Sequence, residues 1–383
     1  MKSIGNITVN GRDFAKAMKA AMTVNEFNPR IPILRCVRLC MVRPGLRIFA
    51  TDLDMEIMVP LDLIEAEGKF DVCIPAALLA KIAAQAGASS IAMLHEEVAN
   101  GKDDEGKPRT KQQITVIVGD EEAEYVLDCL PSSDWPEMTQ PEKLSSAGTF
   151  TNGQLSEIFA EVIKTVSTEE TRYYLNGIHY KGGMCEATDG HRLRRHVFDK
   201  APMHGHDVII PRKACRVIID QGKDGVTLEV DQTGNRMLIS FSNGNRLFSK
   251  MIDGSFPDTE RVIPKEGQFT FDFDAARFRL AVERVISMSS ERGRALKIFN
   301  HEGKACVKVS NPDFGSATAQ TFAEWPIGGE EVGFNGRYIL DFIPKGGRIQ
   351  INGSGSGAPF LIRHVNGVDD DSANTRVVMP MRV

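Results

Sequence analysis

The residues of this chain that could do chemistry gather in one short stretch, Ala187 to His196, which reads ATDGHRLRRH. Asp189 and His191 are separated by one residue, and three arginines follow them. A carboxylate near an imidazole can form an acid/base pair, and arginines can bind phosphate. A catalytic pair also needs a nucleophile or a metal, and no motif of the sequence supplies one. The stretch is therefore interpreted as scaffold, with hydrolysis at Asp189 and His191 as a competing hypothesis.

Two other stretches have the spacing of ligand sites without the residues that such sites need. Gly106 and Lys107 end a G-x-x-x-x-G-K pattern, but Pro108 stands where a Ser or Thr hydroxyl would hold magnesium. His204 and His206 have no carboxylate or cysteine partner at a fitting spacing. The seven cysteines form no C-x-x-C pair, so we expect buried, reduced thiols. The sequence predicts no catalytic residue, no metal and no cofactor.

The elements that position the ATDGHRLRRH stretch belong to a repeat. Asp52 and Asp189 each close an Ala-Thr-Asp triplet, 137 positions apart. Pro75 and Pro211 each precede a short helical pattern, 136 positions apart. A third copy follows, in which KVSNPDFGSATAQTF from Lys308 takes the place of Ala-Thr-Asp and GFNGRYILDFI takes the place of the short helix. Two landmarks with nearly equal offsets argue against coincidence, so the copies are expected to share one plan.

Each copy opens with a helical pattern, in which apolar residues recur at i, i+3, i+4 and i+7 from Phe14, Leu155 and Phe278. Alternating runs rich in Val, Ile and Thr follow, and Asn243-Gly244 predicts a tight hairpin turn. These patterns predict an α+β fold with two helices and antiparallel sheets in each domain. The predicted domains are residues 1–144, 145–265 and 266–383.

Length and charge narrow the classes of protein. No apolar run approaches roughly 18 residues, and the first residues lack a basic segment followed by an apolar one. We therefore expect neither a membrane span nor a signal peptide, and a cytoplasmic location. A formal net charge of -5 argues against a protein that coats nucleic acid with its whole surface. The charged stretch 95–113 has the composition of a solvated hairpin tip.

Six stretches, spread from end to end and in the same order, resemble one family. They read RYYLNGIHY, ATDGHRL, IIPRKA, FSKMIDGSFPDTERVIPK, GFNGRYILDFI and RVVMPMRV. The chain resembles the bacterial DNA polymerase III beta subunits, the replicative sliding clamps. The resemblance implies a non-enzymatic processivity factor that encircles double-stranded DNA as a ring-forming, head-to-tail homodimer. It also implies that the DNA polymerase III alpha subunit, the clamp loader and other proteins with a clamp-binding motif are partners.

A ring around a duplex should carry positive charge on its inner helices. The charges of the six helical segments sum to +5, which leaves -10 for the rest of the chain. These segments are residues 11–24, 76–86, 152–166, 211–220, 274–288 and 335–343. Contacts from Lys and Arg to phosphate are independent of sequence and weaken with salt, which suits a sliding tether. By resemblance, residues 169–174 and the loop from Asn28 lie at the mouth of the hole, although Glu169 would repel phosphate. The side chains expected to contact DNA are Lys16, Lys19, Arg30, Lys81, Arg172, Tyr173, Arg212, Lys213, Arg216 and Arg337.

The resemblance also places a peptide pocket beside the ATDGHRL stretch. Flexible methionines next to a rigid proline at the C-terminus can form an adaptable apolar groove for a Leu or Phe of different partners. Without the resemblance, the same methionines would be read as those of an ordinary core strand. The expected pocket residues are Leu175, Thr188, Gly190, His191, Arg192, Leu193, Pro257, Arg261, Val262, Val377, Met379, Pro380, Met381 and Arg382.

The dimer contact is expected between the first and third domains. By resemblance, Tyr125 and Leu127 meet the region of Ile286 and Met288 in a heterologous contact that closes after two subunits. The cores of the separate domains would explain the same apolar residues equally well. A monomeric peptide-binding scaffold that does not bind DNA therefore remains an alternative to the ring.

Overall fold

The computed structural model describes residues 2–26, 29–102, 108–119, 123–138, 143–199, 206–265, 267–289, 295–365 and 371–383. The chain forms two compact units. Unit 1 contains Met1–Glu157 and Lys213–Met251, and unit 2 contains Ile158–Arg212 and Ile252–Val383. Each sequence copy contributes two α-helices to the described residues, and all four sheets are antiparallel, as the sequence predicted.

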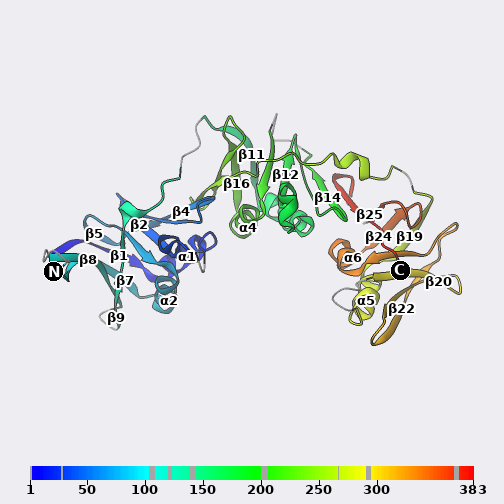
Figure 1. Ribbon diagram of the computed structural model, residues 1–383, viewed down its shortest axis with the longest axis horizontal. Helices are drawn as coiled ribbons and strands as arrows, with labels where there is room; N and C mark the ends of the chain where they lie inside the picture. The colour runs from blue at the N-terminus through cyan, green and yellow to red at the C-terminus, as the bar shows by residue number, and fades with distance from the viewer. Residues whose placement is uncertain are drawn as a thin grey trace. The chain divides into compact units, whose positions relative to one another are not determined.

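Unit 1 contains a nine-stranded and a five-stranded sheet (Figure 1). The larger sheet has the order β10 (Leu130–Pro131), β6 (Asp71–Pro75), β2 (Cys36–Val42), β3 (Gly45–Thr51), β4 (Met55–Asp62), β18 (Arg246–Lys250), β17 (Arg236–Phe241), β16 (Gly225–Val230) and β11 (Ser145–Thr151). The smaller sheet has the order β5 (Glu65–Gly68), β1 (Lys2–Asn10), β7 (Ser90–Lys102), β8 (Pro108–Val118) and β9 (Ala123–Asp128). Helices α1 (Gly11–Ala21) and α2 (Ala76–Ala86) pack against each other.

Unit 2 contains an eight-stranded and a four-stranded sheet. The larger sheet has the order β15 (Asp207–Pro211), β12 (Gly177–Lys181), β13 (Met184–Thr188), β14 (Arg192–Val197), β26 (Asn374–Val378), β25 (Phe360–Val365), β24 (Arg348–Gly353) and β19 (Phe269–Asp274). The smaller sheet has the order β22 (Gly315–Glu324), β21 (Lys304–Asn311), β20 (Ala295–His301) and β23 (Val332–Asn335). Helices α5 (Ala275–Ile286) and α6 (Gly336–Phe342) pack against each other (Figure 1).

The boundary between the units runs through the second sequence copy. Its helix α3 (Gln154–Val162) crosses the boundary, and its helix α4 (Arg212–Gln221) begins there. The reason lies in the strand pairing. Strand β18 of the second copy pairs with β4 of the first, and β14 of the second pairs with β26 of the third. Each half of the middle copy is therefore hydrogen-bonded into a sheet that it shares with a neighbouring copy.

The repeat is visible as one turn built three times. In the first two copies the Thr hydroxyl closes the turn, since Thr51 donates to the carbonyl of Met55 (2.8 Å) and Thr188 donates to that of Arg192 (2.7 Å). Oδ1 of the following Asp accepts two backbone amides in each copy. In the third copy Asn311 takes this role and accepts the amide of Asp313 at 3.0 Å. Short polar side chains that bond to their own backbone favour such turns.

The predicted amphipathic helices bury their apolar faces. Phe14, Phe159 and Phe278 are fully buried. Helix α1 is capped by the side chain of Asn10, and α5 by that of Asp274, each of which accepts an amide from the first turn. Such caps satisfy amides that have no partner inside the helix, which explains why the helices begin at these residues.

The hairpin Asn243-Gly244 agrees with the sequence interpretation, and the cysteines agree with it in part. All seven thiols are free and five of them are buried, whereas Cys40 and Cys129 are half-buried. Burial raises the pKa of Cys36 to about 11 and that of Cys73 to about 12. These two thiols are therefore protonated and unreactive at neutral pH. Gly244 has a φ of +86° between β17 and β18, as a tight turn requires.

The charged stretch 95–113 belongs to an antiparallel hairpin, as its composition suggested, but most of it is strand rather than tip. Most of it belongs to β7 and β8, and His95 is buried. Polar side chains are compatible with strands here because both strands continue past the ends of their outer neighbours. Gly106, Lys107, His204 and Asn28 lie outside the described residues. Within the described residues, no helix has both the length and the apolar character to cross a membrane.

Candidate functional site

The turn that carries Asp189 is fixed by its own neighbours. Oδ1 of Asp189 accepts the amides of His191 (3.0 Å) and Arg192 (3.1 Å), and Oδ2 accepts Nε of Arg192 (2.9 Å). A carboxylate with both oxygens engaged in this way is not placed to take a proton from a substrate. Asp189 and His191 therefore form a structural turn, as the sequence analysis favoured.

Arg192 ties this turn to helix α6. Its guanidinium forms an ion pair with Asp341, lies 4.1 Å from the centre of the Tyr338 ring, and donates to the carbonyl of Lys164. The side chain of Arg192 is 9% exposed, so the guanidinium itself is largely shielded from solvent. Such a buried guanidinium with several acceptors holds two elements in a fixed arrangement.

The turn and two distant segments enclose a cavity of about 260 Å³ within unit 2. Leu175, Leu193 and Val377 are at most 3% exposed and form its apolar base. Leu193 and Val377 are direct partners across β14 and β26. The remaining predicted pocket residues that line the cavity are Thr188, Gly190, Arg192, Pro257, Val262 and Met379.

Four lining residues were not predicted as pocket residues, namely Arg172, Tyr174, Asp258 and Thr259. Asp258 and Thr259 lie between Pro257 and Val262 in the sequence, and Arg172 and Tyr174 come just before Leu175. This adjacency to predicted residues is the signal that could have revealed them.

The other predicted pocket residues lie outside the cavity lining. The carbonyl of His191 accepts the amide of Met379 at 2.8 Å. The imidazole ring of His191 stacks on the ring of Tyr338, with centroids 6.4 Å apart. Met381 bridges to Gly333 of β23. The side chain of Arg261 is 84% exposed and pairs with Asp258. The predicted residues that do not line the cavity are His191, Arg261, Pro380, Met381 and Arg382.

Gly190 is required by the geometry at the rim. Its φ is +86°, and a Cβ atom there would lie 2.6 Å from Nη1 of Arg172. Nε of Arg172 donates to Glu169 at 2.8 Å, and this carboxylate raises the pKa of the guanidinium. Arg172, which was predicted to contact DNA, is thus paired with Glu169 and lies at the cavity rim.

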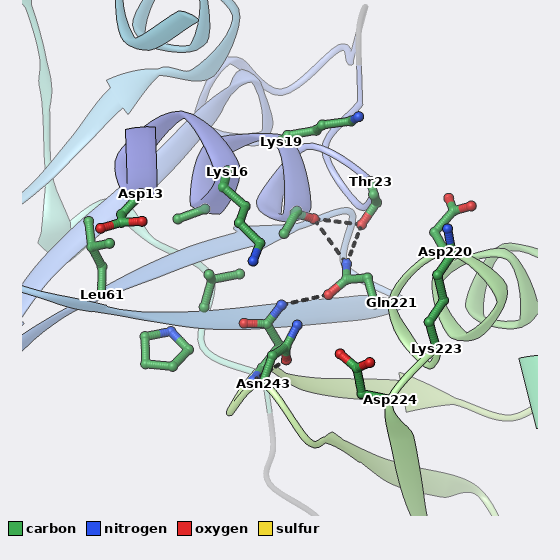
Figure 2. Close-up of a pocket in the computed structure, with 15 residues that line it drawn as sticks. Asp13, Lys16, Lys19, Thr23, Leu61, Asp220, Gln221, Lys223, Asp224 and Asn243 are labelled. Atoms are coloured by element: carbon green, nitrogen blue, oxygen red, sulfur yellow. Dashed lines mark hydrogen bonds between the residues drawn. The ribbon is translucent and has the colours of Figure 1, made fainter. Parts of the chain in front are cut away.

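The basic residues of unit 1 border a groove of about 570 Å³ between α1 and the end of α4. Figure 2 shows Lys16 extending from α1 into this groove, whereas Lys19 does not point into it. Both lysines are exposed. Gln221 joins the two sides, because its Nε2 donates to the carbonyl of Ala20 (3.3 Å) and its Oε1 accepts from Asn245 (2.6 Å).

The groove is mixed in charge. Asp13, Asp220 and Asp224 line it together with Lys16, Lys19 and Lys223 (Figure 2). All three lysines are exposed and can contact phosphate, while the carboxylates prevent a uniformly attractive surface.

The remaining predicted DNA contacts divide by exposure. Lys213 pairs with Asp52 and donates to the carbonyl of Val24 at 2.8 Å, so its ammonium already has partners within unit 1. Arg212 is half-buried, and the ring of Tyr173 is 54% exposed. The members that are exposed to solvent are Arg30, Lys81, Arg216 and Arg337.

The predicted dimer residues lie near open edges. Tyr125 and Leu127 are half-buried on β9, the last strand of the five-stranded sheet, and Val126 between them is 55% exposed. Ile286 ends α5, and Ile286 and Met288 are both half-buried. Strand β22 is the last strand of the four-stranded sheet. An uncovered edge strand has backbone groups that can pair with another chain.

Comparisons with known proteins cover nearly all of the chain. Three family models match: DNA polymerase III beta subunit, N-terminal domain (residues 5–139), central domain (150–258) and C-terminal domain (260–382). The beta sliding clamp of Caulobacter vibrioides is 29% identical, with 98% of this chain and 100% of the relative covered. That of Pseudomonas aeruginosa is 27% identical, with 99% and 100% covered.

Solved structures agree in fold. A DNA polymerase III subunit beta from Bartonella birtlesii, bound to griselimycin, superposes with a TM-score of 0.84 at 30% identity, and 99% of each chain is covered. The pol III beta of Caulobacter crescentus gives a TM-score of 0.83 at 28% identity, with 99% of this chain and 100% of that chain covered.

Proposed function

Because this chain belongs to the DNA polymerase III beta subunit family, the beta sliding clamps, we propose that the cavity in unit 2 binds a short peptide segment of partner proteins. The family consists of non-catalytic processivity factors, and the chain is assigned the function of a DNA sliding clamp that tethers DNA-processing proteins. The DNA polymerase III alpha subunit and the clamp loader are the partners that we propose.

One observation carries the peptide proposal. Segments far apart in the sequence meet to form a cavity with a buried apolar base, Leu175, Leu193 and Val377, and a polar rim. Small binding sites typically combine an apolar lining with a few placed polar groups. A single Leu or Phe of a partner fits such a volume. Griselimycin, which the Bartonella birtlesii relative binds, is proposed to bind this chain as well.

Replacing Val262 by Asp tests the cavity. Val262 lines it and is 41% exposed, so the substitution adds a charge without disturbing a core. The binding of a labelled synthetic peptide with a Leu-Phe pair between polar residues, the probe peptide, should weaken at least about tenfold because an ionised carboxylate opposes apolar burial. Fluorescence anisotropy measures this directly.

The chain offers a matched control. Val365 on β25 is also 41% exposed, and it does not line the cavity. Val365→Asp should bind the probe peptide like the unsubstituted protein. Equal weakening by both substitutions, or none by Val262→Asp, would contradict a peptide site here.

We further propose that two copies close into a ring, with Tyr125 and Leu127 of one copy against Ile286 and Met288 of the other. The open edges β9 and β22 support this contact, because pairing them would satisfy both sets of backbone groups. The proposed domains are residues 1–144, 145–265 and 266–383, and the proposed location is the cytoplasm. The proposed DNA contacts are Lys16, Lys19, Arg30, Lys81, Arg172, Tyr173, Arg212, Lys213, Arg216 and Arg337.

The ring is tested by native mass and by retention on DNA. The chain has a mass of 42.2 kDa, and the native particle should have twice that mass. It should stay on circular DNA after loading and leave the same DNA once the circle is cut, since topology rather than adhesion holds a ring in place. A monomer, or equal retention on circular and cut DNA, contradicts the ring.

A further inference from the structure

A row of ionisable side chains crosses three strands of the eight-stranded sheet. His179 on β12 lies directly opposite Glu186 on β13, and Glu186 lies directly opposite Arg195 on β14. These three residues, here called the charged row, have side chains that are 7%, 2% and 10% exposed. Buried charges are costly unless they are paired and hydrogen-bonded, so their partners decide what the row does.

Glu186 is the centre of the charged row. Its carboxylate accepts Nδ1 of His179 (2.9 Å), Nε of Arg195 (3.0 Å) and the hydroxyl of Thr259 (2.7 Å). Burial raises the pKa of Glu186, but the hydrogen bonds from His179 and Thr259 and the charge of Arg195 outweigh it and hold the pKa below its usual value. The carboxylate is thus ionised in the folded protein.

The charged row also holds a segment outside the sheet, Phe256 to Val262, here called the wall segment. Nη2 of Arg195 donates to the hydroxyl of Thr259 at 2.7 Å, and Nη1 pairs with Glu260. The ring of Phe256 stacks on that of His179, with centroids 4.5 Å apart and planes 20° apart. Each member of the row therefore contacts the wall segment.

Within the described residues, the wall segment has little regular structure of its own. It belongs to no strand, and its only described regular element is the short 3-10 turn Thr259–Val262, which Asp258 caps. The nearest preceding backbone bond to the sheet is that from Ile252 to Ile209. Yet this segment supplies Pro257, Thr259 and Val262 to the cavity, so its position sets the width of the site.

We propose that Glu186 and Arg195 are positioning residues of the cavity, and that affinity for a partner peptide depends on them although neither lines it. The inference rests on the proposed peptide function. Hydrogen bonds to charged groups are directional, so the network holds the Thr259 hydroxyl in one place. Apolar side chains of similar size would fill the same space but would leave the segment free to slide.

The test replaces the buried pair by apolar residues, Glu186→Met together with Arg195→Met. Such replacements are often neutral for stability, so the thermal midpoint should stay within a few degrees. Binding of the probe peptide should weaken about tenfold because a displaced wall no longer matches the ligand. Hydrogen exchange at the amides of Glu260 and Ile263, which are bonded within the turn, should accelerate.

A matched control removes another ion pair from a sheet. Arg38 and Asp71 form two hydrogen bonds of 2.8 Å across β2 and β6 in unit 1. Arg38→Met with Asp71→Leu should leave probe binding unchanged. If the Glu186/Arg195 variant is folded and binds the probe peptide like the unsubstituted protein, the positioning role is refuted.

A second variant decides the question should the double replacement fail to fold. Thr259→Val removes one hydroxyl while Glu186 keeps His179 and Arg195 as partners. Probe binding should weaken several-fold, and unchanged binding overturns the proposal. The two levels of inference fail differently. If the unsubstituted protein does not bind the probe peptide, the peptide function fails. If the unsubstituted protein binds the probe peptide and both variants bind it with the same affinity as the unsubstituted protein, only the positioning role fails.

Discussion

At the scale of single residues, the stretch that could do chemistry turns out to do structural work. A carboxylate, an imidazole and arginines within ten residues are typical of active sites, yet Asp189 bonds to its own turn and Arg192 reaches to Asp341. The equivalent Asp52 bonds in the same way in the first copy, where Asp54 stands at the position of His191. Asp189 is present because its carboxylate closes the turn, and Arg192 joins the turn to Asp341 on α6.

Glu56 gives a pH-dependent prediction at this scale. It is 6% exposed and accepts Nε1 of Trp135 at 3.0 Å. Burial raises the pKa of Glu56, and the Trp135 hydrogen bond and the charge of Arg38 only partly oppose this. Since the folded-state pKa lies above the unfolded one, its contribution favours folding at low pH and is lost as the pH rises through the folded value.

Glu56→Gln should therefore stabilise the protein at neutral pH by about 1 kcal/mol, because Gln still accepts the indole N–H but carries no buried charge. The gain should shrink toward pH 4, where the native carboxyl is itself protonated. Thermal unfolding at pH 4 and pH 7 measures both values. A gain that is larger at pH 4 than at pH 7 would contradict the role given to burial.

At the scale of elements, the cavity depends on how three segments are held, and Gly190 lies where two of them are in close contact. Gly190→Ala places a methyl group 2.6 Å from Arg172 and adds the strain of a positive φ. It should cost about 1 kcal/mol of stability. It should also weaken probe-peptide binding several-fold, because Arg172 lines the cavity and must move.

Gly182 separates these two effects. It also has a positive φ, +54°, but a methyl group there would meet nothing within 4 Å. Gly182→Ala should therefore lose a similar stability and keep its affinity for the probe peptide. Anisotropy titrations of the two variants compare them, and equal affinities would show that the contact with Arg172 does not matter.

At the scale of the whole molecule, DNA binding is a matter of where charge lies on an acidic chain. Lys16→Gln with Lys19→Gln should reduce the slope of log K against log salt by about 2, since each phosphate contact contributes about 0.9. Filter binding or anisotropy over a salt series gives this slope. Lys2→Gln with Lys69→Gln makes the same change of charge at exposed residues outside the helices, and its slope should not change.

If the Lys16/Lys19 and Lys2/Lys69 replacements reduce the slope of log K against log salt equally, net charge alone governs binding. Such a result would remove the assignment of α1 to the DNA-facing surface. No reduction in either pair would contradict phosphate contacts by Lys16 and Lys19.

The sequence by itself determined the repeat, the helices and the turns. These depend on neighbours a few residues apart: the period of Phe14 and Phe278, the Thr-Asp pairs, and the prolines before α2 and α4. It also indicated most of the cavity lining through resemblance. It missed four residues of the lining, Arg172, Tyr174, Asp258 and Thr259. It also did not reveal that Lys213 is engaged by Asp52.

Only the tertiary structure decided which side chains share a site. Glu186 meets Thr259 across 73 positions and Arg192 meets Asp341 across 149. No local pattern encodes such pairs, because the pairing of β14 with β26 and the path of the wall segment bring them together. The tertiary structure likewise decided which charges are available. A lysine or arginine contributes to a surface only when no acid within the fold already holds it, and this depends on the packing of distant strands.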